Sequence, residues 1–329
     1  MFRKILIANR GEIAVRIIRA ARELGIATVA VYSTADKEAL HTLLADEAIC
    51  IGPGKATESY LNINAILSAA VLTEAEAIHP GFGFLSENSK FATMCEEVGI
   101  KFIGPSARVM DVMGDKINAR TQMIKANVPV IPGSDGEVHT AEEALSIAEK
   151  IGYPVMLKAS AGGGGKGIRK VEKAEDLVSA FETASSEAKA NFGNGAMYLE
   201  RVIYPARHIE VQILADQMGH VIHLGERDCS LQRNNQKVLE ESPSIAIGKT
   251  LRNEIGAAAV RAAESVGYEN AGTIEFLLDE ASGKFYFMEM NTRVQVEHPV
   301  TEFVSGVDIV KEQIRIAAGQ PLILKQEDI

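Results

Sequence analysis

Polar residues recur at every second position in one stretch near the carboxyl end of the sequence, from Met288 to Pro299. If this stretch is a β-strand, side chains two residues apart point to the same face. One face is then polar without interruption and consists of Glu289, Asn291, Arg293, Gln295 and Glu297, whereas Met290, Val294 and Val296 point the other way. Such a face is either the solvated side of an antiparallel sheet or a site for chemistry.

The strand expected before this stretch carries a single acidic residue, Glu275, within the apolar run Thr273–Leu278. We expect this run to form a hairpin with Phe285–Met290. In that hairpin Glu275 and Glu289 lie opposite or diagonal on one face, where two like charges destabilise the pair. A hard cation reverses this effect, and carboxylate and amide oxygens suit Mg²⁺ held against phosphate. We therefore favour a metal site at Glu275, Glu289 and Asn291 over a solvated face.

Farther along the same face, Arg293 is suited to hold a second anionic substrate, and Glu297 is suited to take a proton from it. Taken singly, each residue could equally form a surface ion pair. Polar and cationic residues also crowd the segment from Glu226 to Lys237, too densely for a core segment. We favour a site there over a structural polar loop.

A glycine-rich loop, Gly162 to Gly167, follows an expected strand and contains Lys166. A dinucleotide fingerprint must open a helix, but a strand-like run, Ile168–Val171, follows here, and a Walker loop needs Ser or Thr after its Gly-Lys pair. What remains is a hairpin over a triphosphate, with backbone N–H groups near the anion and added charge from Lys158 and Lys166. The alternative is a mobile surface hairpin.

The first hundred residues alternate strand and helix signals, which predicts an α/β fold with a doubly wound parallel sheet. The loop His79–Asn88 follows a strand at the edge where such sheets place ligands, so a site loop and a structural turn are equally favoured. The expected strands are 4–8, 27–32, 77–79 and 101–103, and the expected helices are 12–24, 63–72 and 91–98.

The pattern changes at Asp115, which predicts four segments. They are a Rossmann-like domain over 1–114, a linker over 115–129, a small α+β lid with the glycine loop over 130–203, and a catalytic part over 204–329. In the lid we expect a helix over 141–151, strands over 153–159, 168–171 and 196–203, and a helix over 175–190. In the last part we expect strands over 209–213 and 220–224 and a helix over 251–266.

The composition of the 329 residues excludes several classes of protein. With 47% apolar residues the chain can build a core, and its net charge of −10 offers no footprint for nucleic acid or an anionic membrane. The amino terminus lacks the features of a signal peptide, and the three cysteines have no zinc spacing. A cytoplasmic location is therefore the default expectation.

Together these motifs resemble the ATP-grasp enzymes, and more closely the biotin carboxylases, over essentially the whole chain. The matching stretches are Ile5–Arg16, His79–Gly81, the glycine loop, Glu226–Cys229 and Glu289–Thr301. The resemblance implies a pre-ATP-grasp domain followed by an ATP-grasp fold with a lid. It also implies a ligase that carboxylates biotin on a carrier protein, using ATP, bicarbonate and Mg²⁺ or Mn²⁺, with carboxyphosphate as the intermediate.

The resemblance also implies roles for individual residues. Bicarbonate would contact Lys237, Arg293, Gln295 and the backbone of Val296, and Glu297 would remove its proton, so Lys237, Arg293 and Glu297 are the expected catalytic residues. Mg²⁺ would lie on Glu275, Glu289 and Asn291. The residues expected to contact ATP are Lys116, Lys158, Gly164, Gly165, Glu200, Arg201, Val202, Ile203, His208, Gln232, Asn235, Glu275 and Glu289.

Three departures from the family pattern accompany this resemblance. Asn235 stands where many members have His, Arg201 replaces a common Lys, and the sequence ends at Ile329 before an arginine that the family uses near biotin. The expected protein is the biotin carboxylase subunit of acetyl-CoA carboxylase, acting in fatty acid synthesis beside a carboxyltransferase, and a homodimer when full length. The alternatives are the equivalent domain of a pyruvate or other acyl-CoA carboxylase, another ATP-grasp ligase, and a nucleotide-binding fragment without turnover.

Overall fold

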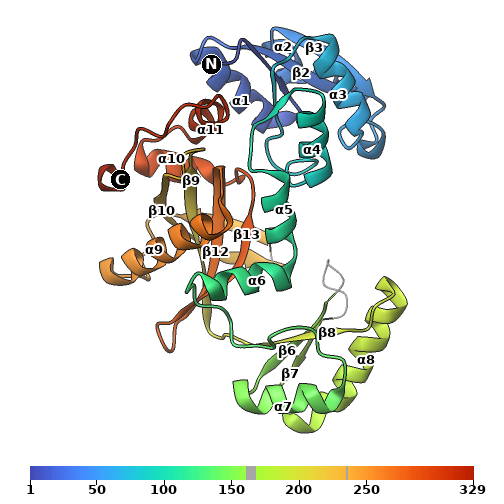
Figure 1. Cartoon of the computed structure of the whole chain (residues 1–329), viewed down its shortest axis with the longest axis vertical. Coiled ribbons are helices and arrows are strands. Elements are labelled where there is room, and N and C mark those ends of the chain that lie inside the picture. Colours follow the sequence, from blue (N-terminus) through green and yellow to red (C-terminus); the bar gives the residue numbers. More distant parts are fainter. Residues whose placement is uncertain (161–167, 235) are drawn as a thin grey trace. The chain divides into compact units, whose positions relative to one another are not determined.

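A computed structural model describes residues 1–160, 168–234 and 236–329, so the predicted glycine loop and Asn235 lie outside the described residues. The chain divides into two compact units (Figure 1). Unit 1 consists of Met1–Val128, Arg207–Phe276 and Phe287–Ile329, and unit 2 of Pro129–Ala206 and Leu277–Tyr286. Among the described residues no helix is long and apolar enough to cross a membrane.

Unit 1 begins with a five-stranded sheet in the order β3-β2-β1-β4-β5, whose neighbouring strands are all parallel. This order confirms the doubly wound sheet, and the chain reverses its direction of winding between β1 and β4. The elements are β1 (Lys4–Ile7), α1 (Gly11–Glu23), β2 (Ala27–Ser33), α2 (Leu40–Leu44), β3 (Glu47–Gly52), α3 (Ile63–Leu72), β4 (Ala77–His79), α4 (Ser89–Glu97) and β5 (Lys101–Phe102).

Alternate residues of β1 enter different cores on the two faces of this sheet. Ile5 and Ile7 pack with α1 and α11 (Ile309–Ala317), whereas Leu6, and Ala8 directly after the strand, pack with α3 and α4. Because both faces are covered, β1 has no polar face, as expected for a central parallel strand. Two residues after the end of β1 lies the buried Asn9, whose side-chain amide donates to the carbonyls of Pro80 (2.7 Å) and Phe82 (2.8 Å).

The second sheet of unit 1 has the order β11-β10-β9-β12-β13 and includes the expected neighbours β12 and β13. Its strands are β9 (Ala206–Ala215), β10 (Val221–Arg233), β11 (Gln236–Glu241), β12 (Asn270–Asp279) and β13 (Phe285–Asn291). The accompanying helices are α5 (Ala107–Gly114), α6 (Lys116–Lys125), α9 (Lys249–Val266), α10 (His298–Ser305) and α11 (Ile309–Ala317). The predicted linker 115–129 thus contains the helix α6, which Asp115 caps by accepting from two backbone N–H groups.

Unit 2 is a three-stranded antiparallel sheet, β7-β6-β8, with two helices on one face (Figure 1). Apolar residues of α7 and α8, among them Ala144, Leu177 and Phe181, form one core with Val155 and Leu157 of the central strand. The bounds are α7 (Ala141–Ile151), β6 (Val155–Ala159), β7 (Ile168–Val171), α8 (Ala174–Phe192) and β8 (Met197–Arg201).

The prediction of one strand through Glu297 is wrong, because β13 ends at Asn291 and α10 begins at His298. A turn forms between them, with the backbone N–H of His298 donating to the Gln295 carbonyl (3.3 Å). Pro299, in the first turn of α10, is compatible with a helix start but not with a continuing strand. Residues 293–297 consequently do not share one strand face.

The expectation that Glu226–Lys237 is too polar for the core is wrong for Glu226–Cys229, which are buried, whereas the described residues from Ser230 to Lys237 are at least partly exposed. Most of this segment belongs to β10 and β11, and Arg227 has 0% of its surface exposed. A buried guanidinium is tolerated only when its N–H groups are hydrogen bonded and its charge is paired. Arg227 meets this condition through partners on other elements of the fold, described below.

Gly272 of β12 lies against the buried ring of Tyr268, and a Cβ atom there would approach the ring atom Cζ to 2.5 Å. We predict that Gly272→Ala lowers the free energy of unfolding by about 1–3 kcal/mol, because the ring is enclosed and its hydroxyl is bound to the Ala271 carbonyl. Urea denaturation measures the change. Gly114→Ala is the control, since a Cβ there meets nothing within 4 Å, and an equal loss in both variants would contradict the packing argument.

Candidate active site

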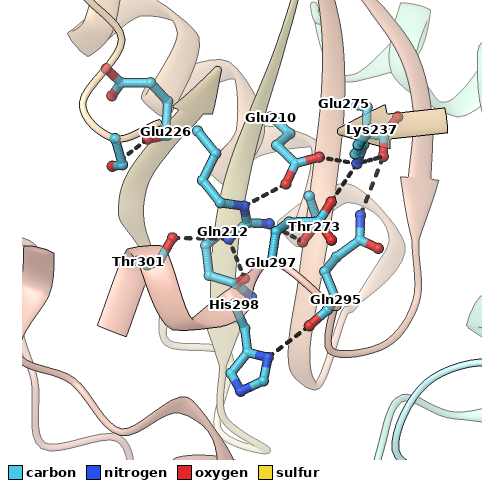
Figure 2. Close-up of polar contacts among 12 residues, drawn as sticks. Glu210, Gln212, Glu226, Lys237, Thr273, Glu275, Gln295, Glu297, His298 and Thr301 are labelled. Carbon is cyan, nitrogen blue, oxygen red and sulfur yellow. Dashed lines mark hydrogen bonds and ion pairs between the residues drawn. The ribbon is translucent and has the colours of Figure 1, made fainter. Parts of the chain in front are cut away.

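The ammonium group of Lys237 lies among three carboxylates from different parts of unit 1 (Figure 2). Its Nζ atom is 2.9 Å from Glu275 on β12 and 2.7 Å from Glu297, which precedes α10, and it also contacts Glu210 on β9. Lys237 itself is on β11, so this one group joins three strands and a loop. Glu210, Glu275 and Glu297 are all buried.

The charges in this cluster stabilise one another. Burial by itself would lower the pKa of Lys237, but the Glu210 and Glu275 carboxylates raise it well above its ordinary value. Burial would raise the pKa of Glu297, whereas the hydrogen bond and charge of Lys237 hold it below its ordinary value. At neutral pH the cluster therefore contains an ammonium group beside an ionised carboxylate that can accept a proton.

Glu275 is the most heavily bonded carboxylate of the cluster. In addition to Lys237 it contacts Nε2 of His208 (2.8 Å), Nδ2 of Asn291 (2.7 Å) and Nε2 of Gln295 (3.2 Å). Burial opposes ionisation, but His208 and Lys237 lower the pKa of Glu275 to about 2. Glu275 is consequently a permanent negative charge in this site.

Glu289 lies near Glu275, as the hairpin predicted. Partial removal from water and repulsion by Glu275 raise the pKa of Glu289, whereas the positive charge of Lys116 lowers it. The repulsion between these two carboxylates is the reason why the sequence predicts a cation at this position. Asn291, the third expected ligand, donates to Glu275 and accepts from Arg293 (3.0 Å) through its side-chain oxygen.

Arg293 is held in place by contacts on several sides. Its Nε atom is 2.8 Å from Glu87, its Nη1 atom donates to Gln295 (2.6 Å), and Nη2 donates to Asn291. Glu87 also accepts from the backbone N–H of Thr292 (3.0 Å). Glu87 belongs to the loop His79–Asn88, so this loop contributes to the site, although the sequence pattern did not single out Glu87.

The residues expected to contact ATP fall in both units. In unit 1, His208 and Gln232 are adjacent, with 2.9 Å between Nδ1 and Nε2. In unit 2, Lys158 of β6 forms an ion pair with Glu200 of β8, and the N–H of Val202 donates to the Pro154 carbonyl (2.9 Å). Arg201 and Ile203 lie at and just after the end of β8. Gly164, Gly165 and Asn235 lie outside the described residues.

Sequence reasoning also missed Glu210 and Arg227. Both have 0% exposed surface, and they face each other directly across the antiparallel pair β9 and β10. The sequence contains one signal that could have revealed Glu210. An acidic and an amide residue, Glu210 and Gln212, alternate there with the apolar Ile209, Val211 and Ile213. On a strand buried on both faces, such residues require polar partners.

Two family models together match most of the chain. Residues 1–110 match the biotin carboxylase N-terminal domain, and residues 115–325 match the ATP-binding domain of the carbamoyl-phosphate synthase L chain. These matches agree with the parallel sheet at the amino terminus and with the site-bearing sheet that follows it.

Curated and solved proteins are similar over the full chain. Biotin carboxylase 1 of Bacillus subtilis is 58% identical over 329 residues, which cover 73% of that protein. A pyruvate carboxylase subunit of Methanothermobacter thermautotrophicus is 56% identical over 329 residues, which cover 67% of it. The biotin carboxylase domain dimer of Hydrogenobacter thermophilus 2-oxoglutarate carboxylase, solved with MgADP, ADP and bicarbonate, superimposes with a TM-score of 0.90 at 55% identity, and 72% of that chain is covered. The chain therefore belongs to the biotin carboxylase family and is an ATP-dependent ligase with an ATP-grasp fold.

Proposed function

We propose that this chain carboxylates biotin with bicarbonate and ATP, and that Lys237, Arg293 and Glu297 carry the chemistry. The observation behind this proposal is the contact between the Lys237 ammonium and the buried Glu297 carboxylate, close to Glu275 and to the residues that hold Arg293. A cation beside a base is the arrangement needed to bind a small acidic anion and to remove its proton.

In this proposal bicarbonate contacts the cations Lys237 and Arg293. Gln295 and the backbone of Val296 complete its site. Glu297 accepts the hydroxyl proton of bicarbonate, and the oxygen that it uncovers attacks the γ-phosphorus of ATP. The bond from that phosphorus to the β-phosphate oxygen breaks, which yields ADP and carboxyphosphate. Lys237 and Arg293 stabilise the negative charge that develops, and most of the catalysis comes from this positioning.

Carboxyphosphate then splits its carbon–oxygen bond to give CO₂ and phosphate beside biotin. The ureido nitrogen of biotin gives its proton to the released phosphate and forms a bond to the carbon of CO₂. The net result is carboxybiotin, ADP and phosphate from biotin, bicarbonate and ATP.

Glu275, Glu289 and Asn291 are proposed to hold Mg²⁺ or Mn²⁺ against the ATP phosphates. The donor set fits, because these are oxygen ligands and two of them are carboxylates that repel each other. To bind the ion, the side-chain oxygen of Asn291 would give up the hydrogen bond that it accepts from Arg293. When bound, the ion would neutralise charge on the transferring phosphoryl group.

The remaining residues are proposed to bind ATP. Lys116, His208, Gln232, Glu275 and Glu289 are the residues contributed by unit 1. Lys158, Glu200, Arg201, Val202 and Ile203 belong to unit 2. Gly164, Gly165 and Asn235, which lie outside the described residues, are also proposed to contact ATP. The ion pair between Lys158 and Glu200 joins two of these proposed ATP-binding residues across the neighbouring strands β6 and β8. The segments 1–114, 115–129, 130–203 and 204–329 remain our proposed domains.

The carrier of biotin is proposed to be a biotin carboxyl carrier protein working with a carboxyltransferase in the cytoplasm. We favour acetyl-CoA carboxylase as the parent enzyme. The relative named as part of a pyruvate carboxylase makes a pyruvate or other acyl-CoA carboxylase the alternative. The dimeric 2-oxoglutarate carboxylase domain supports a homodimer.

The proposal is tested by measuring ADP formation with Mg·ATP while bicarbonate and free biotin are varied separately. We expect hydrolysis to require bicarbonate and to be stimulated by biotin. ADP formation that ignores both would reject the proposal, and Mg·ATP binding in a calorimeter without any turnover would favour a nucleotide-binding fragment.

We predict that Glu297→Gln lowers kcat by about 100-fold or more while the KM for ATP changes by less than about threefold. The reason is that the carboxylate serves as the base for bicarbonate and not as a ligand for the nucleotide. Steady-state kinetics measure both constants. Glu302→Gln, on the adjacent helix α10, is the control, and an equal loss in kcat and ATP affinity for Glu297→Gln would contradict the role of base.

We predict that Glu289→Gln raises the Mg²⁺ concentration needed for half-maximal activity by about tenfold, because an anionic ligand is replaced by a neutral one. The thermal midpoint should change little, since Glu289 is exposed. A magnesium titration at saturating ATP measures the shift. Glu254→Gln on α9 should titrate like the parent protein, and an unshifted titration for Glu289→Gln would remove this residue from the metal site.

A further inference from the structure

We propose that Arg227 is a positioning residue for the bicarbonate site, acting through Glu210 on Lys237. This inference rests on the proposed role of Lys237 in binding bicarbonate. Arg227 is not among the residues to which the sequence assigned a role. Within the part of the chain that the structure describes, its hydrogen bonds lead to Lys237 only through Glu210.

Arg227 is bonded to four residues from three separate elements. Its Nε atom donates to Glu210, Nη1 donates to Gln212 (2.9 Å) and Thr301 (2.9 Å), and Nη2 donates to Thr273 (3.1 Å). Glu210 and Gln212 are on β9, Thr273 is on β12 and Thr301 is on α10. All four partners are buried, so the position of the guanidinium is fixed from several directions.

Glu210 divides its two oxygen atoms between two cations. Oε1 accepts from Arg227 and Oε2 accepts from Lys237 (Figure 2 shows the contact between Glu210 and Lys237). A carboxylate held on one side by a fixed guanidinium can rotate little, so its second oxygen defines where the Lys237 ammonium lies. Lys237 is then kept within 2.7 Å of Glu297, the proposed base.

The charges point to the same role. Lys237 contacts three carboxylates, Glu210, Glu275 and Glu297, and one ammonium cannot neutralise all of them. Arg227 pairs directly with Glu210 and supplies it with a second positive charge. This second charge offsets part of the negative charge around Lys237, which favours the binding of an anion at the position that Glu210 sets for the ammonium.

Arg227 also connects the site to the helix that follows the base. Thr301 lies four residues after Glu297, within the first turns of α10, and its hydroxyl oxygen accepts from the guanidinium. The bond therefore fixes α10 relative to β10. The same bond holds the guanidinium in the position from which it reaches Glu210, so Thr301 supports the lysine through Arg227 and Glu210.

The test is a double-mutant cycle on kcat/KM for bicarbonate with Arg227→Met, Glu210→Gln and the combined variant, assayed in the purified protein. We expect Arg227→Met to lower this constant by about 10- to 100-fold, with an ATP KM within about threefold of the parent. We expect the combined variant to be no worse than Glu210→Gln alone, because Arg227 acts through that carboxylate. Losses that multiply, or an unchanged Arg227→Met, would overturn the inference.

A matched control and a gentler variant separate positioning from folding. Arg252 is also paired with a glutamate, Glu226, at 2.8 Å, but outside this cluster, and Arg252→Met should retain kcat/KM for bicarbonate. If Arg227→Met does not fold, Thr301→Val replaces it in the cycle, since it removes one acceptor and no charge. We then expect a loss of about threefold to tenfold that disappears in the Glu210→Gln background; a loss that persists there would overturn the inference.

An error in the proposed function would give a different result in this experiment. If Lys237 does not bind bicarbonate, Glu210→Gln by itself leaves kcat/KM for bicarbonate unchanged. A reduced value for Glu210→Gln together with multiplying losses instead retains the role of Lys237 and rejects that of Arg227.

Discussion

The buried contact between the Lys237 ammonium and three carboxylates is the interaction on which the rest of unit 1 depends. Three negative charges in one buried cluster are tolerated only with cations among them, because removing a charge from water costs several kcal/mol unless it is paired. The three carboxylates come from β9, β12 and the loop before α10, and the lysine comes from β11. The four charged groups are therefore stabilised only after the sheet has brought these elements together.

The same arrangement explains why the cluster is suited to chemistry as well as to stability. Glu275 is saturated by His208, Lys237, Asn291 and Gln295, whereas Glu297 accepts from Lys237 and stands at the start of a helix. One carboxylate is consequently fixed as a negative charge, while the other has fewer bonds to break when it takes a proton. Two residues of one type thus receive different environments and can serve different purposes.

Sequence patterns predicted regular elements well where a single physical signal dominated. The helices Ile63–Leu72 and Ala141–Ile151 have the predicted bounds, because apolar periodicity agrees there with the capping residues Asn62 and Thr140. The strand Ala77–His79, a short apolar run, also has the predicted bounds. The predictions failed where the tertiary environment overrode a local pattern. Polar alternation after Asn291 resembled a strand, but the buried Val294 and the turn at Gln295 take the chain away from the sheet.

The sequence by itself determined which side chains are available for chemistry, and its strand spacing brought Glu275 near Glu289 and Asn291. It also determined the doubly wound sheet, since hydrophobic periodicity is a local property that survives in the folded protein. Only the tertiary structure decided that Glu87 holds Arg293, and that Glu210 and Arg227 lie behind Lys237. Those contacts join residues 17 to 206 positions apart, and no local periodicity encodes them, because they arise when separate strands and loops pack into one buried site.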